Sequence, residues 1–183
     1  MNNKKQKVLD KVISALLILA LMVSVSSLAL AYDGLDYRVR NKSATYYWGG
    51  TLNSSSSAST YKQLWSSAIS SWNSAVGYSL TYSSSSSNSL DIYYETSSTV
   101  YGVMYPHSVT SGQLTSFSAK VNMGNSENSS SSVFRSTACH ELGHTLGLKD
   151  EYSGTTIMNV NRNRYNIITP RPIDISNVNS LYG

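Results

Sequence analysis

The residues with the clearest potential for chemistry lie in one stretch, ACHELGHTLGLKDEYSGTTIM, at positions 138–158. It contains His140 and His144, two of the three histidines of the chain. Residues four apart on a helix lie on the same face, so both imidazoles can hold one metal ion. Glu141 lies about 100° around the helix from His140, where it is better placed to take a proton from water than to bind metal. The spacing therefore predicts a metal site with a general base beside it.

Two histidines do not complete a catalytic zinc site, which needs a third protein ligand and an open position. Gly147 lets the chain leave the helix in a conformation that other residues resist. Asp150 follows three residues later and is the predicted third ligand, with Glu151 as the alternative. Met158 comes after a further turn-forming segment.

The pattern His-Glu-x-x-His-x-x-Gly-x-x-Asp, with Met158 after it, resembles the metzincin zinc proteases and their Met-turn. Residues 72–95, 119–123 and 174–183 are similar to segments of matrixin-type catalytic domains. The resemblance implies a zincin-like α+β catalytic domain, in which a small mixed β-sheet is combined with an N-terminal helix, an active-site helix and a C-terminal helix. It also implies one catalytic zinc ion, held by two histidines and Asp150, above Met158. An aspartate as third ligand is similar to the snapalysin type.

The predicted function is that of a secreted zinc-dependent endopeptidase that acts on protein or peptide substrates, with Glu141 as general base. By resemblance, the substrate lies along a sheet edge at Gly102, Val103 and Met104, within the segment 102–106. Tyr165 is a candidate for the wall of the substrate pocket or for a hydrogen bond to the reacting carbonyl. The alternative is a non-catalytic surface-binding module that retains a structural zinc site.

Hydrophobic periodicity predicts the elements that position these residues. A helix is expected from the capping box of Thr60 and Gln63 to a stop at Gly77, followed later by helices from about Ser132 and over 173–182. Segments rich in β-branched and aromatic residues predict strands at 43–48, 78–82, 90–94, 100–105 and 119–123. Three serine-rich runs are expected to be loops. This order of strands and helices indicates an α+β domain.

The N-terminus has the features of a secretory signal. A lysine-rich start precedes an apolar run that ends in Ala29-Leu30-Ala31, so residues 1–31 are expected to be cleaved off, leaving the catalytic domain at 32–183. An uncleaved membrane anchor is the alternative. The first 31 residues hold four lysines and one aspartate, so of the 14 basic and 10 acidic residues of the chain, 10 and 9 remain. This balance predicts no nucleic-acid partner, and the Arg162–Arg164 segment is expected to be a solvated loop.

The mature protein is expected to be an extracellular monomer that has no stable association with a membrane after cleavage. Cys139, the only cysteine, precludes an intrachain disulfide and is expected to be a small buried residue. His107 stands alone in its region and is expected in a loop or at a strand end, which argues against a second zinc ion. The sequence makes no prediction about calcium.

Overall fold

The computed structural model describes residues 34–183. The predicted signal segment, 1–31, lies outside these residues. The elements follow in the order β1 (Ser43–Trp48), α2 (Gly50–Ser54), α3 (Ala58–Val76), β2 (Ser79–Tyr82), β3 (Ser89–Tyr93), β4 (Gly102–Thr110), β5 (Gln113–Asn122), α4 (Ser131–Thr145) and α5 (Pro172–Tyr182), with short 3-10 turns at Arg40–Lys42 and Ser126–Ser129. None of the helices in the described part is long and apolar enough to cross a membrane.

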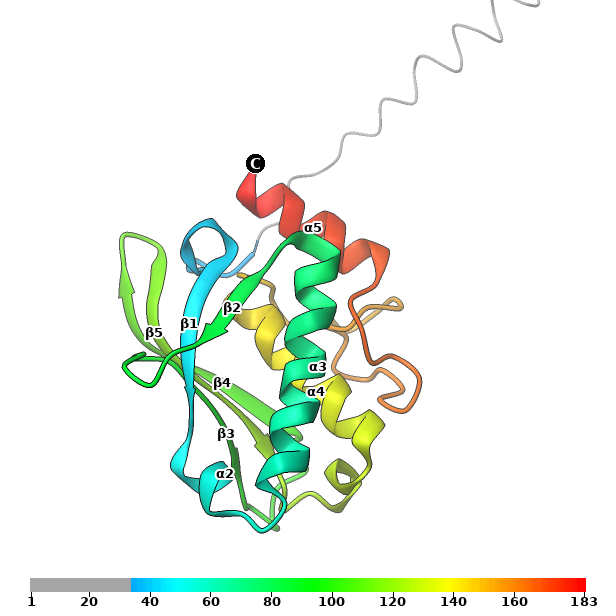
Figure 1. The fold of residues 1–183 in the computed structure, drawn as a ribbon. Helices are drawn as coiled ribbons and strands as arrows, with labels where there is room; N and C mark the ends of the chain where they lie inside the picture. The colour runs from blue at the N-terminus through cyan, green and yellow to red at the C-terminus, as the bar shows by residue number, and fades with distance from the viewer. Residues whose placement is uncertain (1–33) are drawn as a thin grey trace, which may run out of the picture. The chain divides into compact units, whose positions relative to one another are not determined.

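Five strands form one mixed sheet in the order β2-β1-β3-β5-β4 (Figure 1). The pairs of β1 with β2, of β1 with β3 and of β3 with β5 are parallel, whereas β4 runs antiparallel to β5 and forms one edge. The tight turn between β4 and β5 contains Ser111 and Gly112, which both have positive φ, as two-residue hairpin turns require. The central strand β3 is buried almost throughout.

Helix α3 forms because its apolar residues recur on one stripe. Trp65, Ala68, Trp72 and Val76 are buried, and Gly77 ends the helix in the left-handed conformation. The helix begins at Ala58, two residues before the predicted capping box, and its N-cap Ser57 makes no side-chain cap hydrogen bond. The predicted Thr60–Gln63 capping box is therefore wrong, because serine-rich residues before it already join the helix.

Helices α3 and α4 pack against each other, and α4 also packs on β4 and β5 (Figure 1). Between them lies the hydrophobic core, whose largest fully buried side chains include Trp65, Trp72, Phe117 and Phe134. Trp72 donates its indole N–H to the carbonyl oxygen of Cys139 at 2.8 Å, which ties α3 to the middle of α4. This packing keeps α4 in contact with both α3 and the sheet.

Helix α5 begins at Pro172, in the first turn, where proline costs no hydrogen bond. Its Asp174 carboxylate accepts from the backbone N–H of Arg171 at 2.7 Å and from that of Ile157 at 2.9 Å. The second bond ties the start of α5 to the segment that contains Met158. The C-terminal helix thus helps to fix the chain beneath the predicted metal site.

Candidate metal centre

The histidines are presented by α4, which is buried along most of its length. His140 and His144 stand one turn apart on this helix, with ring centroids 4.7 Å apart. The helix ends one residue after His144, and Gly147, at φ 92°, turns the chain back. This turn brings Asp150 opposite the two rings.

Three donor atoms, one each from His140, His144 and Asp150, lie within 4.8 Å of one another. The Asp150 Oδ1 atom is 3.1 Å from His140 Nε2 and 3.5 Å from His144 Nε2. Glu151, the alternative ligand, is not part of this cluster. Its Oε1 atom instead accepts a hydrogen bond from Asn177 on α5 at 3.1 Å.

The backbone fixes the tautomers of both rings. His140 Nδ1 lies 3.0 Å from the carbonyl oxygen of Ile157, and His144 Nδ1 lies 2.8 Å from that of Leu148. A carbonyl oxygen only accepts, so each Nδ1 carries the proton and each Nε2 presents a lone pair. Second-shell bonds of this kind orient metal-binding histidines.

The three facing atoms are therefore all acceptors, which is unfavourable unless a cation lies between them. Protonation of a ring is disfavoured, since burial lowers the pKa of His140 to about 4 and also lowers that of His144. The proximity of His140 lowers the pKa of the Asp150 carboxyl, so Asp150 is the ionised member of the cluster. Two neutral imidazoles and a carboxylate form a donor set that suits zinc.

Glu141 lies beside this cluster and is only 4% exposed. Burial raises the pKa of its carboxyl to about 8, while the charge of Arg162 opposes that rise. Gly102, the first residue of β4, approaches so closely that a Cβ there would be 2.8 Å from Glu141 Oε1. The helix and the edge strand thus hold the carboxyl between them.

Met158 is 1% exposed, and its sulfur lies directly against Gly143, which stands between the two histidines on α4. A side chain at Gly143 would collide with it. Met158 is therefore a buried apolar residue packed against α4 beside the two histidines. Cys139 is fully buried, as predicted.

Other predicted residues lie elsewhere. Gly102, Val103 and Met104 form the start of the edge strand β4, next to Glu141. His107 lies within β4 rather than in a loop or at its end, and its Nε2 is 2.9 Å from Ser118 Oγ, outside the metal cluster. Tyr165 is 54% exposed and lines an adjoining hollow rather than the one that contains Glu141.

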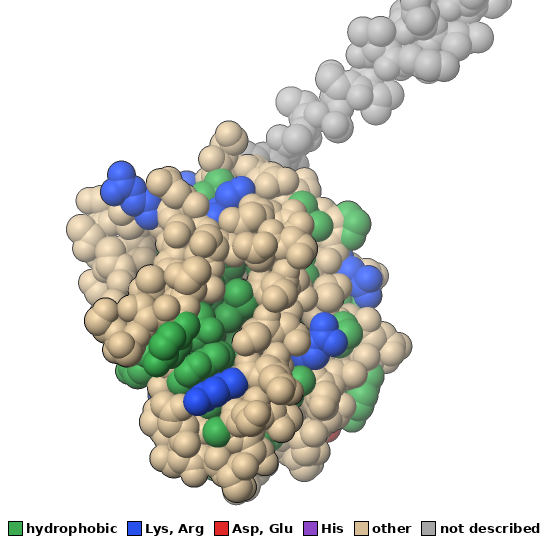
Figure 2. Space-filling model, in the orientation of Figure 1, with side chains coloured by type: hydrophobic (Ala, Val, Ile, Leu, Met, Phe, Trp, Pro, Cys, Tyr) green, Lys and Arg blue, Asp and Glu red, His purple; other side chains and the backbone are tan. Residues whose placement is uncertain are grey.

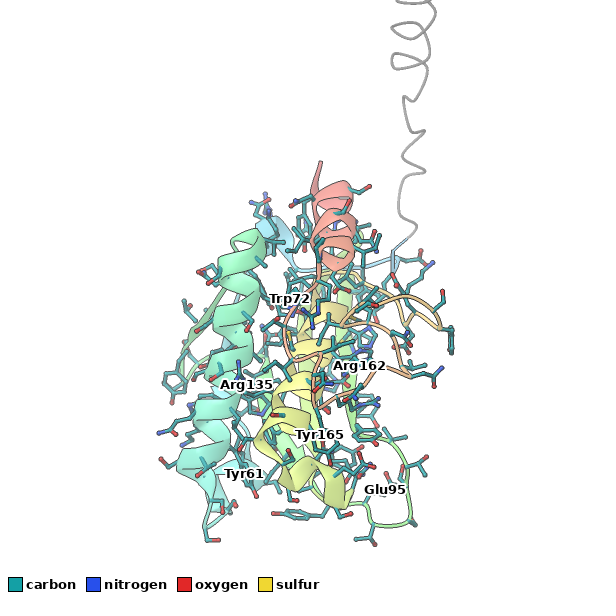
Figure 3. The ribbon with its side chains drawn as sticks, turned by 90° about the vertical axis from the view of Figure 1, so that its right-hand side faces the viewer. Tyr61, Trp72, Glu95, Arg135, Arg162 and Tyr165 are labelled. Carbon is teal, nitrogen blue, oxygen red and sulfur yellow. The ribbon has the colours of Figure 1, made fainter. Side chains whose placement is uncertain are left out.

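Sequence reasoning missed the role of Arg162. The expectation of a solvated loop at Arg162–Arg164 is wrong: Arg162 is 5% exposed and binds Ser136 through Nε (to Oγ, 2.9 Å) and Nη2 (to the carbonyl oxygen, 3.0 Å). The Nη1 atom of Arg162 donates to the carbonyl oxygen of Asn159 at 3.1 Å. It also lies 3.3 Å from His140 Nδ1, but that ring nitrogen carries a proton, which it donates to Ile157, and so it accepts no hydrogen bond from Arg162. Figure 3 shows Arg162 beside α4.

A pocket of about 340 Å³ opens beside the cluster. It is lined by Thr99, Val100, Tyr101, Gly102, Thr137, His140, Glu141, Asp150, Val160, Arg162 and Arg164. The side chain of Asp150 is 44% exposed, so the donor cluster is open on this side. The geometry combines a predicted metal site, a buried carboxyl and room for a ligand.

No family model matches the sequence, and no curated protein matches it. Among solved structures, the chain is similar to a chain of the structure described as "GM1 bound form of the ECX AB5 holotoxin". The two share 14% sequence identity and superpose with a TM-score of 0.52, over 83% of this chain and 87% of that chain. At this identity, the likeness concerns the fold alone.

These comparisons correct the family and the fold family assigned from the sequence. No family model supports a metzincin, and the solved structure that is similar in fold is described as an AB5 holotoxin rather than as a metzincin with a zincin-like domain. The fold is accordingly a mixed sheet with helices, similar to that of a chain in an AB5 toxin structure. A motif of a few residues defines a local helix and its exit, and this does not determine the fold around it.

Proposed function

We propose that the protein is a zinc-dependent endopeptidase that hydrolyses peptide bonds in protein or peptide substrates outside the cell. The observation that carries the proposal is the convergence of three acceptor atoms, from His140, His144 and Asp150, beside the buried Glu141 in one open pocket. Structural zinc sites are closed by four protein ligands, whereas catalytic sites have three and an open position. A buried carboxyl beside the ligands can act as a general base in a catalytic site, whereas a structural site gives it no role.

The three clustered residues would hold the ion. A bound zinc ion would polarise the scissile carbonyl and make the attacking water more acidic. A cation held beside Glu141 would favour the ionised form of its carboxyl. The Glu141 carboxylate takes a proton from that water while the water oxygen forms its bond to the carbonyl carbon. Glu141 then delivers the proton to the amide nitrogen as the C–N bond breaks.

The edge strand β4 provides a place for the substrate. In the sheet that the structure describes, β4 pairs only with β5, so its other side is available to an extended peptide. Such a peptide would add to the sheet through backbone hydrogen bonds, which make little demand on sequence. Since Gly102 contacts Glu141, a chain along β4 would pass the general base.

Replacing Glu141 by glutamine tests the proposal. The amide keeps the shape but accepts no proton, so the rate of casein or peptide cleavage should fall by about 10²–10⁴-fold, with zinc content unchanged. A chelator should abolish wild-type cleavage, and added zinc should restore it. Glu95→Gln is the matched control, because Glu95 is an exposed glutamate outside the pocket (Figure 3). Undiminished cleavage by zinc-loaded Glu141→Gln would refute the mechanism.

A second candidate is a non-catalytic binding module with a structural zinc site, which binds a carbohydrate or protein surface. It is supported by the likeness in fold to a toxin structure described in a GM1-bound form. It is also supported by hydrophobic side chains that gather on the face where β1 and β2 lie beside α3 (Figure 2). There Trp48 and Tyr82 stack at 6.5 Å between ring centroids, and Lys62 lies over the Trp48 ring.

The two candidates predict opposite outcomes. A binding module would lose glycan or protein binding on Trp48→Ala and would be unaffected by Glu141→Gln. A peptidase would lose turnover on Glu141→Gln and would keep it on Trp48→Ala. Geometry favours the peptidase, because the binding module gives no role to Glu141.

A further inference from the structure

The pocket beside Glu141 contains two guanidinium groups. It is lined by Val100, Tyr101 and Gly102 at the start of β4, by residues of α4, and by Val160, Arg162 and Arg164. Its volume of about 340 Å³ leaves room for a side chain of a bound peptide. We call it the arginine pocket.

Arg162 is fixed by the protein. Its Nε, Nη1 and Nη2 all donate to oxygen atoms of Ser136 or Asn159, at 2.9–3.1 Å. It therefore contributes a stationary positive charge to the pocket, and it positions the segment that follows Met158. The remaining capacity to bind a ligand lies with its neighbour, Arg164.

Arg164 is held in a different way. Its guanidinium lies over the ring of Tyr101, at 3.7 Å from the centroid, and its Nη2 donates to the carbonyl oxygen of Val160 at 3.0 Å. Its Nε is buried without a hydrogen-bond partner. The guanidinium is therefore held in one orientation, but part of its hydrogen-bonding capacity is unused. Its planar arrangement of N–H donors matches the two oxygen atoms of a carboxylate.

Neither guanidinium has an acidic partner at contact distance. Over residues 34–183, no carboxylate oxygen lies within 4.0 Å of Arg162 or Arg164. Glu141 and Asp150 line the same pocket, and Glu127 lines the adjoining hollow, but all three lie beyond that distance. Arg162 is buried and Arg164 half-buried, so solvent and these more distant carboxylates compensate the two positive charges only in part.

We propose that the arginine pocket binds a carboxylate side chain of the substrate, so that the enzyme prefers an aspartate or glutamate next to the cleaved bond. This inference rests on the proposed peptidase function. An apolar side chain would cover the two guanidinium groups without compensating their charge. A carboxylate instead gives Arg164 the charged acceptor that it lacks.

The test uses fluorogenic peptides that differ only in the residue on either side of the cleaved bond, with Glu, Gln, Leu and Lys compared at each position. We expect kcat/KM for Glu to exceed that for Gln by at least about tenfold at one of the two positions. The preference should weaken with rising salt, because Arg164 is only half-buried. Equal cleavage of the Glu and Gln peptides at both positions would overturn the inference.

Charge reversal sharpens the test. Arg164→Glu should lose the preference for Glu and gain one for Lys, while cleavage of the Leu peptide remains measurable. Arg40→Gln, which removes a charge from an exposed position outside the pocket, should leave the preference unchanged. A preference for Glu that survives in Arg164→Glu would also overturn the inference.

Failure of the function and failure of the inference give different results. If wild type cleaves none of the peptides, the proposed function fails. Cleavage without regard to charge contradicts the arginine pocket alone. Equilibrium binding of the Glu and Gln peptides to the Glu141→Gln variant tests the pocket without turnover, and equal affinity there would count against it.

Discussion

At the scale of single residues, the position of Asp150 separates two ligand assignments that the sequence left open. Asp150 lies opposite both histidines, whereas Glu151 binds Asn177 on α5. Asp150→Ala should therefore weaken zinc binding by at least about 100-fold and abolish activity, because two ligands do not hold the ion in a catalytic geometry. Glu151→Ala should leave zinc affinity within about threefold of wild type. Titration against a competing chromophoric chelator measures both.

The pair of variants also serves as a control for a general loss of structure. Both remove a carboxylate from adjacent positions in the same loop, so thermal unfolding of the two metal-free proteins should be similar. If Glu151→Ala loses the metal and Asp150→Ala retains it, the ligand assignment is wrong by one residue.

The sequence predicted the cluster of His140, His144 and Asp150 because its geometry is local. His140 and His144 are related by one helical turn, and Gly147 reverses the chain before Asp150. The arginine pocket depends instead on contacts between distant segments, such as that of Arg162 with Ser136, 26 residues away. No periodicity in the sequence signals such a pair.

At the scale of elements, the three predicted helices correspond to α3, α4 and α5, and the predicted strand at 43–48 coincides with β1. The short helix α2 was not predicted. The hairpin of β4 and β5 was underestimated, since it extends to Thr110 and resumes at Gln113. Its outer half is rich in serine and threonine and largely exposed, so hydrophobic alternation is weak there. The outer residues form strands nonetheless, because their backbones pair between β4 and β5.

The contact between β4 and α4 predicts the effect of a single methyl group. In Gly102→Ala, the new Cβ would lie 2.6 Å from Thr137 Cγ2 and 2.8 Å from Glu141 Oε1, so the strand or the carboxyl must move. A displacement of about 1 Å at a catalytic group can cost about 10²-fold in rate. We expect a loss of kcat of that order with zinc content unchanged.

Gly50→Ala is the control for this variant, because a Cβ at Gly50 would meet no atom within 4 Å. Steady-state kinetics and metal analysis of the two proteins provide the measurement. Full activity of Gly102→Ala would mean that Glu141 is not held against β4 in the working enzyme.

At the scale of the whole molecule, the three clustered donor residues adjoin the hydrophobic core, but none of them belongs to it. The core is built from residues such as Trp65, Trp72, Phe117 and Phe134, whereas the cluster lies on the open face of α4. The backbone carbonyls of Ile157 and Leu148 orient both histidine rings without help from an ion. The fold should therefore persist without metal, and zinc should add stability only through its binding free energy.

Removal of zinc tests this expectation. A ligand that binds only the native state at about 100 times its Kd adds about 2.7 kcal/mol, which for a domain of this size corresponds to a change in Tm of about 5–10 °C. We expect a chelator to lower Tm by that amount while the far-UV circular dichroism spectrum at 25 °C stays the same. Asp150→Ala should show no such shift. Loss of the native spectrum on chelation would mean that the ion is structural, and would favour the binding module. An unchanged Tm with no bound zinc would mean that the protein has no metal site.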